Sequence, residues 1–342
     1  MSNIDNTSID QYLEDLEVAK QDIKESLEKK GATVTGGLSS YAGFIDALET
    51  VDPKQHLPNG ISFDGSTIDV FDLSPYDWSM VYDYSEMFQN CTKLTGFGDN
   101  LGNAFENMLA CRDMFYNCDK LTTIPLLDTS KVVNMRGMFR DCSLLTTIPL
   151  LDTSKVVNMD QMFYNCGKLT TIPLLDTSKV VNMNQMFYVC IGLTSVPQLD
   201  TSSVTNMNYM VGGCSKLTSI PQLDTSKVVN MRDMFYNCNS LTTIPLLDCS
   251  SVTNTYSPIG SYNLSNLTDI GGFKNLKVSW SSNFLDRVPN ATVESLMNVI
   301  NNLYDLTSNG LSGQTLKFGT TNLNKLTADQ KAVATNKGWT LT

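Results

Sequence analysis

The sequence predicts a solenoid of stacked, mixed α/β coils with a different segment at each end. Fifteen residues, LTTIPLLDTSKVVNM, occur three times without a change, starting at Leu121, Leu145 and Leu169. Related copies continue from Leu193 to Leu241 at the same spacing of 24 residues. The apolar positions recur at the same places in every copy. One such unit cannot enclose its own apolar side chains, but stacked copies bury them in a continuous core.

Composition and charge exclude several classes of function. The chain has 342 residues, of which 42% are hydrophobic, so it can bury a large core. Lys and Arg number 24 against 35 Asp and Glu, and no basic cluster appears. We therefore expect no nucleic-acid partner. No apolar run has the length of a membrane span, and the first residues lack the features of a secretory signal. The single histidine, His56, disfavours His-based triads and His-rich metal sites.

Each repeat reads L-T-x-I-P-x-L-D-T-S-x-V-x-N-M-x-x-M-F-x-x-C. We expect a short parallel strand near LTTI, a second near KVVNM and a helical turn through MFYNC. The proline after each Ile should end the first strand because proline cannot donate to a ladder. Weaker copies extend the repeat, and the solenoid is assigned to residues 77–277. The period lies within the range of leucine-rich repeats.

The repeat FYNCxxLTTIPLLDTSKVVNMxxM resembles the BspA-type leucine-rich repeats of bacterial surface proteins. This resemblance covers more than half of the chain. It implies a right-handed α/β leucine-rich-repeat coil with 24-residue repeats. It does not imply one activity, because such repeats are similar across adhesins, surface antigens and phage proteins.

Residues 1–51 are predicted to be a helical anchor or oligomerisation segment. Ser8 and Gln11 fit a capping box. A 3-4-3-4 spacing relates Ile9, Tyr12, Leu16, Ala19 and Ile23. This seam either pairs with another helix or packs on its own domain. A second short helix is expected at 40–51. Together the two resemble N-terminal helices of structural proteins from phages of gut bacteria. Residues 52–76, rich in Pro, Gly and Asp, are predicted to be a linker or hairpin.

Residues 278–342 are predicted to form a small α/β capping domain. A helix is expected over 292–306 and a strand over 315–319. Thr327 and Gln330 fit a second capping box, Gly338 a helix stop, and Trp339 should then pack back. The segment resembles the C-terminal cap of BspA-type proteins, which shields the last coil.

Two regular rows of side chains are candidate ligand sites. Seven of the nine cysteines recur once per coil, without a CxxC motif, and we expect them to be buried and reduced rather than zinc ligands. An aspartate recurs in each D-T-S: Asp128, Asp152, Asp176, Asp200, Asp224 and Asp248. These carboxylates fit Asx-turns at a corner of each coil, and the alternative is a row of calcium ligands.

A row of tyrosines is the candidate ligand-facing surface. Tyr116, Tyr164, Tyr188 and Tyr236 follow the MF pair, and Arg140 and Gly212 interrupt the row. Tyr209 belongs to the neighbouring positions between the two Met residues, where variation among coils concentrates. The row is either a platform for sugars or a partner protein, or a cover over the ridge between coils.

No catalytic, cofactor-binding or metal-binding motif is recognised, and we expect a non-enzymatic protein without a cofactor. The first hypothesis is a phage virion protein, a head or tail fibre or decoration protein released by lysis. It would be a homo-oligomer that contacts other virion proteins through residues 1–51 and a host-surface glycan or protein through the solenoid, without membrane insertion. The alternative is a bacterial surface adhesin. A glycan depolymerase is the third hypothesis, although identical coils favour no carboxylate pair.

Overall fold

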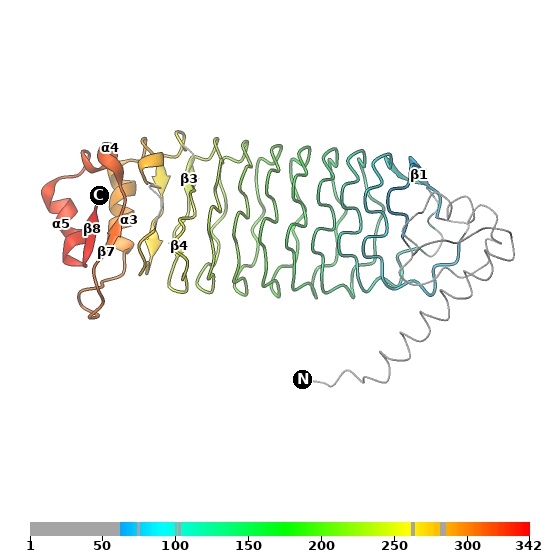
Figure 1. The fold of residues 1–342 in the computed structure, drawn as a ribbon, viewed down its shortest axis with the longest axis horizontal. Helices are drawn as coiled ribbons and strands as arrows, with labels where there is room; N and C mark the ends of the chain where they lie inside the picture. Colours follow the sequence, from blue (N-terminus) through cyan, green and yellow to red (C-terminus); the bar gives the residue numbers. More distant parts are fainter. Residues whose placement is uncertain (1–61, 74–75, 100, 102–103, 261–263, 281–284) are drawn as a thin grey trace, which may run out of the picture.

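The chain forms a rod of stacked coils closed at its C-terminal end by a small helical unit (Figure 1). The computed structural model describes residues 62–73, 76–99, 101, 104–260, 264–280 and 285–342. The predicted N-terminal helices, the seam from Ile9 to Ile23 and His56 lie outside these residues. The solenoid prediction is confirmed by parallel bridges that join each coil to the next at a spacing of 24 residues, from Asn134↔Asn158 to Asn206↔Asn230.

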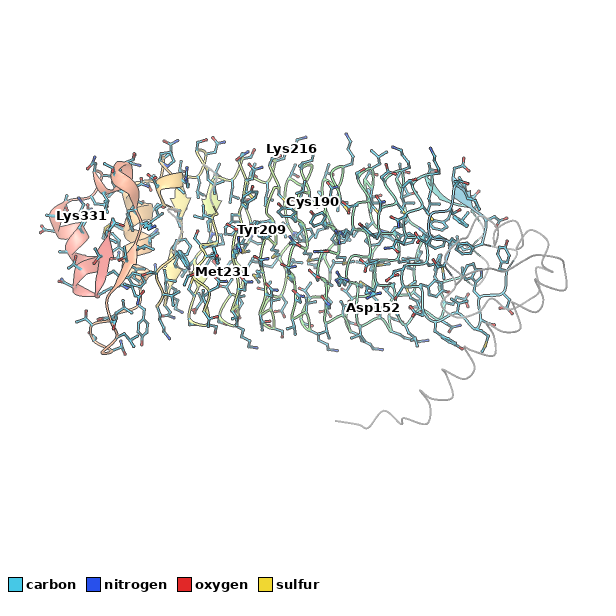
Figure 2. The ribbon with its side chains drawn as sticks, viewed as in Figure 1. Asp152, Cys190, Tyr209, Lys216, Met231 and Lys331 are labelled. Atoms are coloured by element: carbon cyan, nitrogen blue, oxygen red, sulfur yellow. The ribbon has the colours of Figure 1, made fainter. Side chains whose placement is uncertain are left out.

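Each coil has two arms that meet at sharp corners. The first arm, L-T-x-I-P-x-L, includes residues 121–127 of the first perfect repeat. The second arm, V-x-N-M-x-x-M-F-x-x-C, includes residues 132–142. Leucines of the first arm and Met, Phe and Cys side chains of the second arm belong to one hydrophobic cluster. The outward residues of the two arms therefore lie on opposite sides of that core. Asp152 marks one edge of the rod and Lys216 the other (Figure 2).

Regular strands are few, and they concentrate at the two ends of the solenoid. β1 (Val70–Phe71) pairs in parallel with β2 (Gly96–Phe97), β3 (Thr243–Ile244) with β5 (Asp269–Ile270), and β4 (Leu247–Asp248) with β6 (Phe273–Lys274). The first-arm strand is thus present only in the terminal coils. In the central coils the first arms keep single bonds such as Thr146 N–H to Thr122 O at 3.3 Å. The proline after each Ile has no backbone N–H to donate, so the ladder of hydrogen bonds between first arms stops there.

The helical turn predicted through MFYNC is wrong. Two residues of each second arm lie in the left-handed region, for example Gln161 at φ 56° and Asn165 at φ 56°. Left-handed residues at this spacing interrupt a right-handed helix. The backbone instead makes successive turns whose alternate N–H groups donate to the following coil, as Phe163 N–H donates to Met186 O at 2.9 Å. Pattern analysis missed this because Met, Phe and Tyr fit a helix as well as a turn.

The core is a set of side-chain columns that run along the rod. Phe88, Phe115, Phe139, Phe163 and Phe187 stack with centroids 5.5–5.7 Å apart and rings within 11° of parallel. Buried hydroxyls and thiols satisfy backbone carbonyls beside this stack. The same position of successive coils therefore meets a copy of itself, which explains why these residues hardly vary.

The solenoid begins before the predicted boundary at Asp77. Phe63, Phe71 and Leu73 are buried in the core. Phe63 N–H donates to Met87 O, and Gly65 N–H donates to Gln89 O at 2.9 Å. Residues 62–73 of the predicted linker therefore belong to the first described coil of the solenoid. Their Gly and Asp content reflects tight corners rather than an extended connection.

The C-terminal unit follows the sequence prediction in type and order. It comprises η1 (Leu285–Arg287), α3 (Val293–Asn302), β7 (Gln314–Leu316), α4 (Gly319–Leu323), α5 (Ala328–Asn336) and β8 (Trp339–Leu341). The Thr327–Gln330 capping box is present, Gly338 has φ 84°, and Trp339 is 1% exposed. α4 was not predicted.

The first helix of this unit covers the end of the solenoid. The Ser295 hydroxyl of α3 accepts from Ile270 N–H at 2.7 Å. α3 ends at Asn302 rather than Leu306, because the Lys337 ammonium binds the carbonyls of Asn301 and Leu303 at 2.6 and 3.2 Å. The unit thus supplies partners for the last coil, which is what a cap must do.

Candidate binding face on the second arm

The cysteine row is structural. All nine cysteines are buried and free. The thiols of Cys142, Cys166 and Cys214 each donate to a Phe carbonyl of the preceding coil at 3.1 Å. Burial raises the pKa of Cys190 and Cys238 to about 12. The prediction that the cysteines are buried is confirmed.

The aspartate row makes Asx-turns. Each carboxylate accepts from the backbone N–H two residues on, as Asp176 Oδ1 does from Ser178 at 3.0 Å. Hydrogen bonds from the Ser178 hydroxyl and N–H lower the pKa of Asp176. Among the residues that the structure describes, no group of three or more His, Cys, Asp or Glu side chains could hold a metal ion. The turn interpretation is therefore the one that the geometry supports.

Two structural rows were missed by the sequence analysis. The asparagine of V-x-N-M makes a second Asx-turn in each coil, as Asn182 Oδ1 accepts from Asn184 N–H at 3.0 Å. The five threonines of D-T-S are buried, and four of them donate to the next coil, as Thr177 Oγ1 does to Asp200 O at 2.8 Å. The signal for the asparagine was available, since it recurs every 24 residues with an acceptor side chain.

Four of the five predicted tyrosines come together into one continuous row of ring contacts. Tyr164 and Tyr188 have centroids 5.2 Å apart, Tyr188 and Tyr209 5.3 Å, and Tyr209 and Tyr236 5.7 Å. Tyr209 fills the gap at Gly212, where a Cβ would lie 3.2 Å from the Tyr209 ring and 3.1 Å from the Tyr188 ring. The glycine and the displaced tyrosine are therefore one arrangement.

Arg140, an interruption in the sequence, is a member of the same stack. Its guanidinium lies 4.8 Å from the ring centre of Tyr116 and 5.1 Å from that of Tyr164. Arg232 repeats the arrangement further along, 4.1 Å from the Tyr256 ring. Cation–π contacts of this kind stabilise the row. The tyrosine rings themselves are not parallel: Tyr164 and Tyr188 are tilted by 34°, and Tyr209 meets Tyr188 and Tyr236 edge to face at 87° and 69°.

The positions between the two Met residues form two polar rows beside the tyrosines. Asn184 bridges its neighbours, since its amide donates to Asp160 Oδ1 at 2.7 Å and its own Oδ1 accepts from Asn208 at 2.8 Å. Gln161 donates to Gln185 at 2.6 Å. These half-buried amides and carboxylates are held in place by each other, so they are preorganised for hydrogen bonding.

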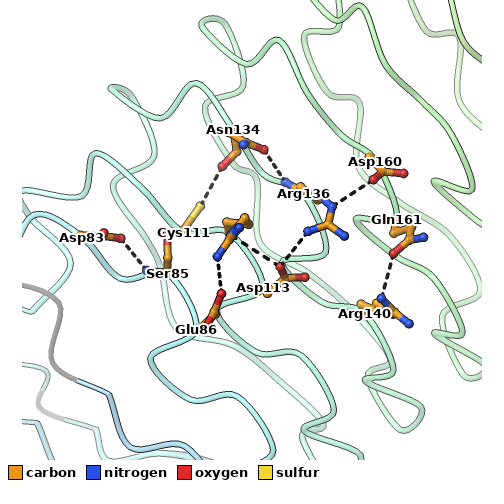
Figure 3. Close-up of polar contacts among 11 residues, drawn as sticks. Asp83, Ser85, Glu86, Cys111, Asp113, Asn134, Arg136, Arg140, Asp160 and Gln161 are labelled. Atoms are coloured by element: carbon orange, nitrogen blue, oxygen red, sulfur yellow. Dashed lines mark hydrogen bonds and ion pairs between the residues drawn. The ribbon is translucent and has the colours of Figure 1, made fainter. Parts of the chain in front are cut away.

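An ion-pair network occupies the N-terminal part of this face (Figure 3). Arg136 reaches Asp113 at 3.4 Å and Asp160 at 3.1 Å, and so joins three coils. Burial raises the pKa of Asp113, opposed by the charges of Arg136 and Arg112. The carboxylate lies over Gly137, where a Cβ would be 1.9 Å from its Oδ1. Glycine at φ 60° is thus required there.

We call these three rows the variable face, since their residues differ among otherwise similar coils, as do the residues at the positions equivalent to Asp141, Ser143 and Leu144 that follow them. It consists of the second-arm positions equivalent to Arg136, Gly137 and Arg140 in coils from Arg112 to Tyr236. No helix of the described part of the chain is long and apolar enough to cross a membrane.

The comparisons with known proteins agree with the fold. Residues 61–122, 106–194 and 168–273 match the family described as "Mycoplasma protein of unknown function, DUF285". The chain belongs to this family, whose repeats are BspA-like, so the predicted BspA-type leucine-rich-repeat resemblance is confirmed. A search of curated proteins finds no match.

Three solved structures are similar over much of their length. A leucine-rich repeat protein from Bacteroides ovatus is 15% identical and covers 62% of this chain and 82% of its own, with a TM-score of 0.21. A leucine rich cell surface protein from Faecalibacterium prausnitzii is 17% identical, and the match covers 58% of this chain and 76% of that protein, with a TM-score of 0.21. An internalin from Listeria monocytogenes is 14% identical, and the match covers 75% of this chain and 79% of that protein, with a TM-score of 0.24. At these TM-scores the similarity supports no conclusion about this chain.

Proposed function

We propose that this chain is a non-enzymatic binding protein of the bacterial cell surface, an adhesin whose variable face contacts a glycan or protein of a host surface. The observation that carries the proposal is the division of labour within each coil. Core, Asx-turn and buried threonine positions repeat with little change, whereas the outward positions from between the two Met residues to the end of the coil differ from one coil to the next. A scaffold that keeps its stacking residues and varies one outward face is suited to recognition rather than catalysis.

The composition of the variable face favours polar recognition. Asp160, Asn184, Gln185 and Asn208 supply donors and acceptors in fixed positions, and the tyrosine rings add apolar area with polar tips. This combination suits the hydroxyl groups of a glycan or the backbone of a glycoprotein. Membership in a BspA-like family supports placement on the bacterial surface. The virion hypothesis finds no support in that family and stays a prediction.

Binding to immobilised mucin tests the proposal. Asn184→Arg introduces a residue that the chain already carries at positions 136 and 232, so the coil should fold. We expect mucin binding to fall at least tenfold, because the bridge to Asp160 and Asn208 is lost and a long side chain covers the face. Asn239→Arg, the same change at an exposed corner, is the control. Equal binding by wild type and Asn184→Arg would refute the face.

Immunogold labelling tests the location. An antibody against the solenoid should label the envelopes of intact cells. Label confined to phage particles from a lysate would instead restore the virion hypothesis and overturn the surface proposal.

A further inference from the structure

The first arms build a second surface with a different character. Six consecutive first arms, residues 121–127, 145–151, 169–175, 193–199, 217–223 and 241–247, contain no charged residue. We call this surface the neutral face. At the average of the whole chain, 17% charged, these 42 residues would carry about seven charges. The adjoining first arms at either end carry Asp99 and Asp269, so the neutral stretch has a charged boundary at both ends.

The neutral face exposes the most accessible leucines of the described residues. Leu126, Leu150 and Leu174 are 75%, 68% and 64% exposed. They follow the prolines of three identical first arms and form a row along the rod. In the next two coils Gln198 and Gln222 take the same position. An exposed apolar row without charges marks an interaction surface rather than an ordinary solvated face.

Much of the polar capacity of the neutral face is used by its own backbone. The hydroxyls of Thr122, Thr146 and Thr242 donate to the carbonyl of the preceding coil at 3.1–3.3 Å. The amides of Gln198 and Gln222 donate to carbonyls of the following coil at 2.8 and 2.7 Å. The exposed leucines beside them have no donor or acceptor for the hydroxyl groups of a sugar polymer. The face therefore suits a dry, uncharged protein surface.

The size and charge of the neutral face fit a second copy of this chain. Six coils at about 4.8 Å and seven residues at about 3.3 Å give a face of roughly 670 Å² in projection. A stable interface takes about 800 Å² of accessible surface per partner, which a corrugated face of this size approaches. The chain has a net charge of −11, so two copies repel each other. The neutral face lets them meet without opposing like charges at the contact.

We propose that two copies of this chain pair through their neutral faces in a two-fold symmetric dimer. The same surface on both partners closes the assembly and leaves both variable faces outward. The proposal does not depend on the binding function, because the two faces lie on opposite sides of the core.

Sedimentation equilibrium of the full chain tests this proposal. We expect twice the chain mass of 37.8 kDa for the wild type. Leu150→Lys places a charge at a 68% exposed position, which the fold tolerates, and should give a monomer. Leu150→Gln imitates Gln198 and should raise the dimer Kd at least tenfold. Val133→Lys, at a 51% exposed position of the second arm, is the matched control and should stay dimeric.

Three results would overturn the dimer: a monomeric wild type, a Leu150→Lys variant that remains dimeric, or a Val133→Lys variant that dissociates equally. The second result would place any self-association elsewhere, for example in residues 1–51. Mucin binding by the same samples is read separately, so loss of the dimer and loss of the binding function are distinguishable.

Discussion

Replacing Phe163 by alanine tests whether the stacked core holds the coils together. Phe163 is fully buried and lies 5.7 Å from Phe139 on one side and 5.7 Å from Phe187 on the other. Truncation of a buried Phe typically costs about 3–5 kcal/mol. We expect the upper part of that range, about 4–5 kcal/mol, because two stacked contacts are lost together. The cavity cannot close either, since Phe139 N–H and Phe163 N–H fix the adjacent coils through inter-coil bonds of 3.0 and 2.9 Å.

Hydrogen exchange is the suitable assay, because long repeat arrays need not unfold as one unit. The opening free energy of the Phe139 and Phe163 amides should fall by the full amount. Val211 occupies the Phe position of another coil and is 1% exposed, so Phe163→Val should recover part of the loss. A cost below about 1.5 kcal/mol would contradict the range expected for a stacked Phe. So would a Phe163→Val variant as unstable as the alanine variant.

Four further predictions concern the rows of side chains that repeat from coil to coil and the coils themselves. Thr177→Val should lower the free energy of unfolding by about 1 kcal/mol in chemical denaturation, because the hydrogen bond to Asp200 O is lost. Thr153→Val should be neutral or stabilising, because the Thr153 hydroxyl is buried without a partner. An equal loss of stability in the two variants would contradict this. The thiols of the native chain should not react with a thiol reagent at pH 8, because burial raises the pKa of Cys190 and Cys238 to about 12. All nine cysteines should react in denaturant. Rapid labelling of the native chain would contradict their burial. Hydrogen bonds from serine lower the folded-state pKa of Asp128, Asp176 and Asp224. The stability that these bonds contribute is therefore present above the unfolded-state pKa and is lost as pH falls through the folded-state pKa. A free energy of unfolding that rises below pH 4 would contradict the Asx-turns. Deletion of residues 145–168 should leave a folded chain with an unchanged shape of melting transition, since the flanking coils present the same partners; a collapsed transition would refute interchangeable coils.

The sequence predicts the columns of this fold well and its backbone poorly. Leu121, Met135, Phe139 and Cys142 recur every 24 residues, and each proves to be fully buried. The C-terminal caps were also readable, because Thr327 and Gln330 have the residue types and spacing of a capping box.

The left-handed positions were readable in part: the second one in each coil is Asn, Asp or Gly in six of seven described coils, residue types that favour φ above zero, whereas Gln161, Gln185 and Val189 have no such preference. Inter-coil hydrogen bonds, which no local pattern records, hold them there. The binding face shows the same limit. The tyrosines were found by their spacing, but Arg140 as a stacking partner and Tyr209 as the substitute for Gly212 needed the three-dimensional neighbours.

A coil swap tests the central claim, that a constant scaffold presents a variable recognition face. The variant Asn184→Arg, Gln185→Gly, Tyr188→Arg gives one coil the variable residues of another, Arg136, Gly137 and Arg140, and keeps every core and Asx-turn residue. We predict an unchanged Tm and at least a tenfold loss of binding to immobilised mucin. Unchanged binding at an unchanged Tm would contradict the claim.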